Sequence, residues 1–259
     1  MLTPPEIARS LLAAGESKAR LPFGKMLLLA ILAGAYIALA GVGATAAAVT
    51  VESGSLAKLL SACVFPAGLS MVILAGSELF TGNCLMVMAL LERRITPAQL
   101  LRNWLTVYLG NAMGGAAVAA LAVYSHTASL FGDGLARSMV SIAESKAALG
   151  AGDAFLRGVL CNFLVCLAVW MAAASKRAEG KVIALFFPIL LFVLCGYEHC
   201  IANLYYLPAG AFAAAEYGME TTLTLAGCLK NLAAVTLGNL VGARSGLPLR
   251  LSQRMMRRP

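Results

Sequence analysis

Long runs of apolar residues, separated by short segments rich in charge, extend over most of the 259-residue chain. A helix needs roughly twenty apolar residues to cross a bilayer, so these runs predict six transmembrane helices. The second and fifth runs are longer and are interrupted by polar residues, at 76–83 and 196–199, and each is expected to be a broken helix. The predicted spans cover approximately residues 26–49, 59–91, 100–124, 155–174, 182–215 and 222–241.

The composition supports an all-α polytopic membrane protein. Apolar residues make up 60% of the chain, charged residues only 12%, and the mean hydropathy is +0.83. A soluble domain is nearer half apolar and a quarter charged. A transmembrane β-barrel would alternate in roughly ten-residue segments instead of staying apolar for twenty. We expect an amphipathic cytoplasmic helix at 1–25, a six-helix transmembrane domain at 26–243 and a basic cytoplasmic tail at 244–259.

The distribution of the net charge of +8 indicates membrane topology instead of nucleic-acid binding. Six spans place both termini on one side, and that side carries fifteen lysines and arginines against four on the other. This bias puts both termini in the cytoplasm, and we expect the chain in the cytoplasmic (inner) membrane, in contact with lipid and without nucleic acid. The four outer cations are Lys58, Arg137, Lys146 and Arg157.

The first twenty residues predict a surface helix, since their charges interrupt any apolar signal-peptide core. Residues 3–6 (TPPE) form a capping-box pattern with proline in the first turn. One apolar face follows, which predicts a helix lying on the membrane surface. That face contains Ile7, Leu11, Leu12 and Ala14.

Neither a metal nor another cofactor is expected. The seven cysteines lie in apolar stretches without a C-x-x-C pair or a histidine cluster, which favours small buried hydrophobic side chains over zinc ligands or disulfides. The nucleotide-binding pattern G-x-x-x-x-G-K-[ST] is absent, so the sequence gives no sign of ATP-driven transport.

Two pairs of segments repeat along the chain. Residues 103–114 (NWLTVYLGNAMG) and 231–242 (NLAAVTLGNLVG) match at six positions with an offset of 128. Residues 76–83 (GSELFTGN) and 196–203 (GYEHCIAN) match at Gly, Glu and Asn with an offset of 120. Three spans separate the partners, so the two halves are expected to cross in opposite directions. Such an inverted 3+3 repeat places a solute site near the midplane, where the interrupted helices meet.

The ionisable residues at the interruptions are functional candidates, because charge is costly inside a membrane. They are Glu78, Glu198 and His199. The glutamates either belong to a solute pathway or only bind exposed backbone N–H groups at the breaks. For His199 function is favoured, because its repeat partner is apolar Leu79 and a scaffolding role would predict a polar pair.

Apolar side chains near the breaks predict narrow constrictions, at Phe65, Leu69, Leu79, Phe80 and Phe192. An apolar neck opposes a bare anion but admits a small neutral acid. A histidine beside the neck is suited to exchanging the proton that interconverts the two forms. Lys146, in the predicted outer loop, either concentrates anions or is an ordinary solvated loop lysine.

These motifs resemble the formate–nitrite transporter family, and the match extends over all six spans in order. The segments that carry it are residues 75–83 (AGSELFTGN), 158–170 (GVLCNFLVCLAVW) and 196–203 (GYEHCIAN), with Asn103, Trp104, Gly110, Asn111, Asn231, Gly238 and Asn239. The resemblance implies an aquaporin-like protomer and a homopentamer with one pathway per subunit. It also implies transport of small monovalent anions coupled to protons. Nitrite or formate is favoured, with hydrosulfide, acetate or lactate as alternatives.

The resemblance also assigns residues to roles. His199 is similar to the family's central histidine, and Thr81 to its threonine partner on the facing break. The cytoplasmic constriction then contains Leu69, Leu79 and Phe80, and the outer one Phe65 and Phe192. The remaining pathway residues are Lys146 as the outer-vestibule lysine, Asn162, Glu78 and Glu198. Asparagines expected to hold the broken helices are Asn83, Asn111, Asn203 and Asn239.

Two transport mechanisms remain open. In one, the anion is attracted by Lys146, takes up a proton, crosses as the neutral acid and reionises. In the other, protonated His199 pairs with the anion. The first is preferred, because desolvation opposes a charged imidazole. An intramembrane enzyme using His126, His199 and Glu198 is not expected, since no catalytic motif accompanies them. A purely structural subunit would not require two broken helices.

Overall fold

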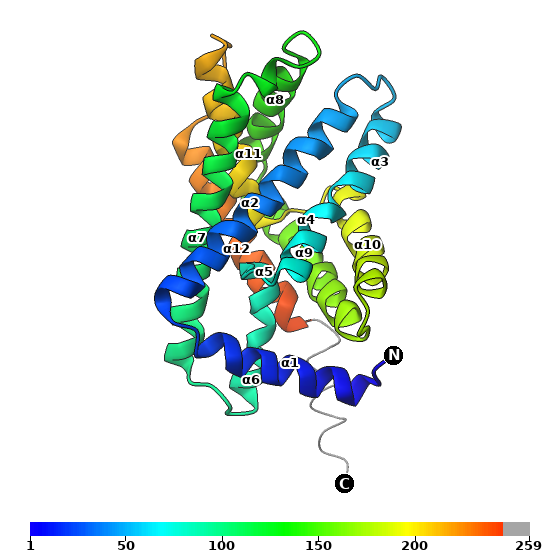
Figure 1. The fold of residues 1–259 in the computed structure, drawn as a ribbon. Coiled ribbons are helices and arrows are strands. Elements are labelled where there is room, and N and C mark those ends of the chain that lie inside the picture. The colour runs from blue at the N-terminus through cyan, green and yellow to red at the C-terminus, as the bar shows by residue number, and fades with distance from the viewer. Residues whose placement is uncertain (246–259) are drawn as a thin grey trace.

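The computed structural model describes residues 1–245; the last fourteen positions of the predicted basic tail lie outside this part. Within residues 1–245 the chain is helical without any strand, which confirms the predicted all-helical class. The long helices form one bundle (Figure 1). The α-helices are α1 (Pro4–Ala19), α2 (Phe23–Ala48), α3 (Gly54–Val64), α4 (Pro66–Ala75), α5 (Phe80–Asn83), α6 (Val87–Leu91), α7 (Pro97–Tyr124), α8 (Gly134–Ala148), α9 (Ala151–Ala173), α10 (Ala178–Leu194), α11 (Cys200–Glu216) and α12 (Leu225–Ser245), with 3₁₀ turns η1 (Cys84–Met86) and η2 (Thr127–Ser129).

Several of these helices can cross a bilayer by length and composition. In the described part of the chain there are five, at Phe23–Ala48, Gly54–Ala75, Pro97–Tyr124, Ala151–Ala173 and Leu225–Arg244. The second predicted span begins on Gly54–Ala75 and continues into the shorter apolar stretch Phe80–Leu91. The fifth predicted span falls on α10 and α11, which have 17 residues each and are shorter than the roughly twenty needed for a full crossing.

At two places a helix is followed by a glycine in the left-handed backbone conformation. α4 ends before Gly76, with φ of 76°, and α10 ends shortly before Gly196, with φ of 68°. Residues with a Cβ rarely adopt this conformation, so glycine is the natural helix terminator here. At the end of each non-helical segment, Leu79 and His199 have extended backbones and directly precede α5 and α11. Each turn therefore brings a new helix N-terminus into the interior of the bundle.

Glycines allow two helix pairs to pack closely. The most extensive contacts join α2 to α7 and α9 to α12. A Cβ on Gly114 would overlap the carbonyl oxygen of Ile31, and one on Gly242 would overlap that of Val159. These small-residue faces are thus used for packing within one subunit. The two pairs form the frame that holds α5 and the beginning of α11.

Helix α1 lies across one end of the bundle (Figure 1). At its start the Glu6 carboxylate accepts the Thr3 N–H at 2.7 Å, and this bond lowers the pKa of Glu6 from its ordinary value. Ile7, Ala8 and Leu12 are buried against the rest of the chain. Protein contacts therefore account for this part of the apolar face, while a position on the membrane surface stays a prediction.

The segment between α7 and α9 was predicted to be a loop, and this was wrong for most of its length. It folds into α8, which lies at the end of the bundle opposite α1 (Figure 1). Leu135, Met139 and Ala143 recur every four residues and are buried, so an amphipathic helix is the stable form. Lys146 lies in the last turn of this helix instead of in a loop.

Candidate functional site

Two cavities lie at opposite ends of the bundle, one beside α8 and one beside α1. We name them the outer and the inner cavity after the predicted membrane topology. The outer cavity has a volume of about 410 Å³, and its lining includes Lys58, Ser61, Phe65, Lys146, Glu198 and His199. The inner cavity has a volume of about 560 Å³, and its lining includes Lys18, Leu69, Glu78, Leu79, Lys176 and Lys181. The lining of each cavity therefore combines lysines with one glutamate at a helix break.

A small apolar seal separates the cavities. It encloses about 10 Å³, at most room for one water, and shares Phe65, Phe192 and His199 with the outer cavity and Leu69 and Leu79 with the inner one. The rings of Phe65 and Phe192 meet edge to face, with centroids 5.7 Å apart. The structure thus brings together four of the five predicted constriction residues.

Phe80, the fifth predicted constriction residue, is placed differently. It is buried, and its ring packs edge-on against Tyr108, with centroids 5.0 Å apart. It lines none of the three spaces described above. In this structure the Phe80 ring therefore packs against α7 at the break. A contribution of Phe80 to a constriction stays a prediction.

Among residues 1–245, His199 is the only titratable side chain in the lining of the seal. It caps α11, because its Nδ1 accepts the Ala202 N–H at 3.1 Å. Its Nε2 lies 2.9 Å from Thr81 Oγ1 on α5. A nitrogen that accepts an N–H carries no proton, so this geometry fits a neutral ring with its proton on Nε2, donated to Thr81. The ring stacks on Phe192 with an interplanar angle of 19°.

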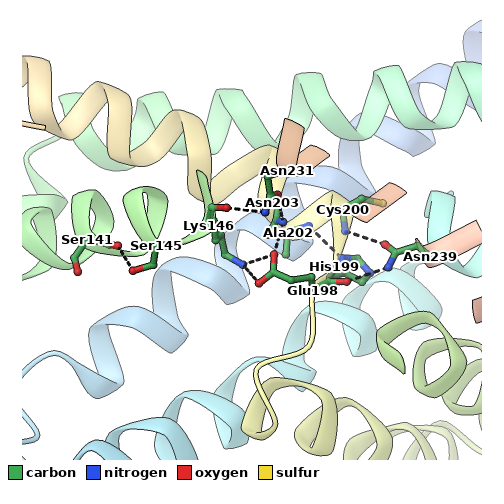
Figure 2. Close-up of polar contacts among 10 residues, drawn as sticks. All are labelled: Ser141, Ser145, Lys146, Glu198, His199, Cys200, Ala202, Asn203, Asn231 and Asn239. Atoms are coloured by element: carbon green, nitrogen blue, oxygen red, sulfur yellow. Dashed lines mark hydrogen bonds and ion pairs between the residues drawn. The ribbon is translucent and has the colours of Figure 1, made fainter. Parts of the chain in front are cut away.

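Glu198 organises the polar end of the outer cavity (Figure 2). Its carboxylate accepts Lys146 Nζ at 2.9 and 3.1 Å and Asn203 Nδ2 at 2.7 Å. Asn203 also donates to Asn231 Oδ1 at 2.8 Å, and Asn231 Nδ2 donates to the Lys146 carbonyl at 2.8 Å. Lys146 is therefore held in an ion pair, and the interpretation as an ordinary solvated lysine is wrong.

Glu78 has the same set of partners in the inner cavity. It accepts Lys18 Nζ at 2.6 Å and Asn83 Nδ2 at 2.7 Å, and Asn83 donates to Asn103 Oδ1 at 2.9 Å. Lys18 was missed in the sequence, although a signal was available: it precedes Lys146 by 128 residues, the offset of the longer repeat. Both glutamates bind side chains, so the alternative that they only bind backbone N–H groups is wrong.

Two asparagines bind the exposed backbone at the breaks. Asn239 accepts the Cys200 N–H at 2.9 Å and donates to the carbonyls of Gly158 and Glu198 at 2.8 and 2.9 Å. The Asn111 amide holds the other break in the same way, accepting the Phe80 N–H at 3.0 Å. Buried peptide groups that lack a helical partner are thus satisfied by amides.

Asn162 also has a supporting position. It is fully buried and donates to the Asn239 carbonyl at 2.8 Å. It lines neither cavity nor the seal.

The described residues include no group of three or more His, Cys, Asp or Glu side chains arranged to hold a metal. His126 packs against Tyr217, with ring centroids 6.5 Å apart, and lines none of these spaces.

A helical bundle with bilayer-length apolar helices, two opposed cavities and an apolar seal between them defines a membrane channel or transporter for small solutes. The comparisons identify which one. The sequence model of the formate/nitrite transporter family matches residues 5–247. The chain therefore belongs to this family of channels and transporters, which are not enzymes, and is a multi-pass membrane protein.

Individual relatives and structures agree with this assignment. The chain is 38% identical to a probable formate transporter of Methanothermobacter thermautotrophicus, covering 93% of this chain and 92% of the relative. It is 39% identical to the formate channel FocA of Haemophilus influenzae, over 82% and 80%. A solved FNT family ion channel superposes with a TM-score of 0.85 at 30% identity, over 98% and 99%. A pentameric formate channel with formate bound has a TM-score of 0.80 at 30% identity, over 91% and 98%.

Proposed function

We propose that this chain moves small monovalent anions of weak acids across the membrane, with formate as the first candidate and nitrite as the second. The observation that carries the proposal is the seal between the cavities, where one hydrogen-bonded imidazole faces otherwise apolar side chains. The names of the relatives, which include several formate channels, favour formate. Hydrosulfide, acetate and lactate remain the alternatives within the family.

The solute crosses the seal as the neutral acid. Burying an unpaired carboxylate costs several kcal/mol or more, whereas a protonated acid of the same size is far less costly to desolvate. The Lys146 ammonium favours the anionic form of the solute in the outer cavity. The anion then takes a proton from water, which leaves a hydroxide ion in the outer solution, and the neutral acid enters the seal. After crossing, the acid enters the inner cavity and reionises there.

In this scheme His199 acts as a neutral hydrogen-bond donor. Its Nε2 proton, shared with Thr81 Oγ1 at 2.9 Å, is available to the oxygen of a passing acid. The rival mechanism, a protonated His199 paired with the anion, requires Nδ1 to carry a proton as well. That proton would face the Ala202 N–H, which now donates to Nδ1. The described contacts therefore support the neutral-acid mechanism.

The same proposal includes the arrangement in the membrane. Six spans in two inverted halves, with breaks at residues 76–79 and 195–199, form an aquaporin-like subunit with both termini in the cytoplasm. The placement in the cytoplasmic membrane rests on the charge bias. A homopentamer is supported by the solved pentameric formate channel, which is 30% identical. A stripe of exposed apolar residues on α7 is suited to lipid or subunit contact, at Leu101, Leu105, Leu109 and Met113.

Transport by purified protein in liposomes tests the function. Formate and nitrite uptake are followed by internal pH and by swelling, at several external pH values. We expect uptake that rises as the external pH falls toward the pKa of the solute. His199→Asn is expected to lower the rate and to change its pH dependence, while the matched His126→Asn variant transports as the wild type does. Wild-type rates and an unaltered pH profile in His199→Asn would exclude a role for the imidazole.

A further inference from the structure

The lysines of the outer cavity differ in whether their charge is compensated. Lys146 Nζ lies 2.9 and 3.1 Å from the two oxygens of Glu198, and its side chain is only 15% exposed. Figure 2 shows the ammonium directed at the carboxylate. Seen from the mouth of the cavity, this pair is a dipole without net charge, and a dipole attracts a distant anion much less than a charge does.

Lys58 is an uncompensated cation in the same cavity. It lines the cavity together with Lys146, it is exposed to solvent, and within residues 1–245 it forms no ion pair or hydrogen bond through its side chain. Lys58 and Ser61 lie about one turn apart on α3, Phe65 directly follows this helix, and all three line the cavity. One face of the helix thus leads from the lysine down to the seal.

We propose that Lys58, and not Lys146, captures the anion at the outer mouth. Its charge raises the local anion concentration, and Lys146 with Glu198 then provides the polar end of the cavity. This inference rests on the proposed function, because it assigns a capture step to that pathway. It adds a group outside the glutamate networks, which the sequence did not single out.

The inner cavity has a comparable arrangement. Lys18 is paired with Glu78 at 2.6 Å, whereas Lys181 lines the same cavity and forms no side-chain ion pair within the described residues. Lys181 lies on α10, and Phe192 of that helix reaches the seal. Each cavity therefore contains one lysine paired with a glutamate and, on a segment that leads to the seal, one lysine without an ion pair among the described residues; the lining of the inner cavity also includes Lys176.

The expected effect is on capture and not on passage. A unit charge about 6 Å from an anion in water contributes an interaction that changes local concentration by about threefold. Lys58→Met should therefore raise the KM for formate uptake about threefold at low ionic strength and leave the maximal rate unchanged, and Lys58→Glu should raise KM about tenfold. Lys58→Arg should keep the wild-type KM. At an ionic strength near 1 M, where the screening length falls to about 3 Å, the differences should vanish.

A second measurement reports the electrostatic potential of the outer cavity and does not depend on transport. Ser61→Cys, in a background with Cys63, Cys195 and Cys228 replaced by alanine, is labelled with anionic and cationic methanethiosulfonates. The ratio of the anionic to the cationic labelling rate should fall about tenfold when Lys58→Met is added, since each rate changes about threefold in opposite directions. Arg137→Gln, which removes an arginine at the same end but outside the cavity lining, should leave the ratio unchanged.

The two measurements separate the possible failures. If the wild type carries none of formate, nitrite, hydrosulfide, acetate and lactate, the proposed function fails, and the labelling ratio still decides whether Lys58 sets the potential of the cavity. If transport occurs but Lys58→Met changes neither the KM nor the labelling ratio, capture by Lys58 is wrong. An equal change in Arg137→Gln would likewise overturn it, because the effect would then be a general surface charge.

Discussion

The outer and inner cavities are built on the same polar frame but differ at the seal. In each, a lysine and an asparagine bind a glutamate at a helix break, and a second asparagine supports the first. At the equivalent positions next to the seal, however, the outer side has His199 and the inner side Leu79. The same hydrogen-bonded network stabilises the break in both cavities. The two breaks differ in one residue next to the seal, histidine in the outer half and leucine in the inner half. The residues that stabilise the helix breaks are therefore largely distinct from His199, the residue that provides the polar group of the seal.

The amides that bind the backbone test the scaffold half of this comparison. Asn239→Leu keeps the number of side-chain heavy atoms but removes the partner of the Cys200 N–H and one hydrogen bond to each of the Gly158 and Glu198 carbonyls. We expect a loss of about 4 kcal/mol of stability, and a similar loss for Asn111→Leu. Unfolding in detergent measures both. A much smaller loss in one of them would show that the two breaks are not held equivalently.

The two ion pairs should differ in strength, because they differ in exposure. Lys146→Met leaves Glu198 buried and unpaired, and is expected to cost about 3 kcal/mol; the Lys18 side chain is 29% exposed, so Lys18→Met should cost about 1 kcal/mol. Adding Glu198→Gln to Lys146→Met should restore part of the loss, since no unpaired charge then remains. Equal losses for the two lysines would contradict the argument from exposure.

The hydrogen bond between Thr81 and His199 tests the role of the imidazole. Thr81→Val removes the partner of His199 Nε2 and is expected to cost about 1.5 kcal/mol and to reduce formate uptake. Thr81→Ser keeps the hydroxyl and should transport nearly normally. The matched change Ile201→Val, at the position 120 residues later, should cost about 1 kcal/mol through packing alone and leave the pH profile of transport unaltered. Stability and uptake are measured on the same preparations.

The smallest effect concerns the far end of α8. Glu144 accepts the Thr222 N–H at 2.7 Å and the Thr221 hydroxyl at 2.9 Å, and these bonds lower the pKa of its carboxyl. A lowered pKa in the folded state means that the stabilisation is present at neutral pH and is lost as the pH falls through that pKa. Glu144→Gln should therefore speed amide exchange at residues 221–224 at pH 7. The difference from wild type should disappear in acid, and Glu220→Gln serves as the control.

Much of the fold follows from the sequence, because apolar runs of bilayer length leave few alternatives to helices. The exception was α8. Its buried residues, such as Leu135 and Met139, are spaced along a segment that is polar on average, so a search for continuous apolar runs passes over it. The helical period was readable there, and it predicts the element once the search is for one apolar face.

The candidate site was only partly predictable. His199 and Thr81 could be named from motifs at the breaks, and the structure places their side chains 2.9 Å apart. Lys18 could not be found from local pattern, because its partner Glu78 lies 60 residues away. Phe80 was assigned to a constriction because it is one of the apolar residues near the breaks and because of the family resemblance. Adjacent residues at a helix start need not face the same way, and the ring of Phe80 packs against Tyr108.

The bond from Ala202 to His199 Nδ1 makes the imidazole both the end of a helix and the polar group of the seal. Its orientation is consequently as stable as the first turn of α11, and rotation of the ring would have to begin with fraying of that turn. Replacement by leucine would disturb both roles at once. Asparagine is itself a good helix cap, so it can preserve the start of the helix while removing the ring, which makes it the informative substitution at this position.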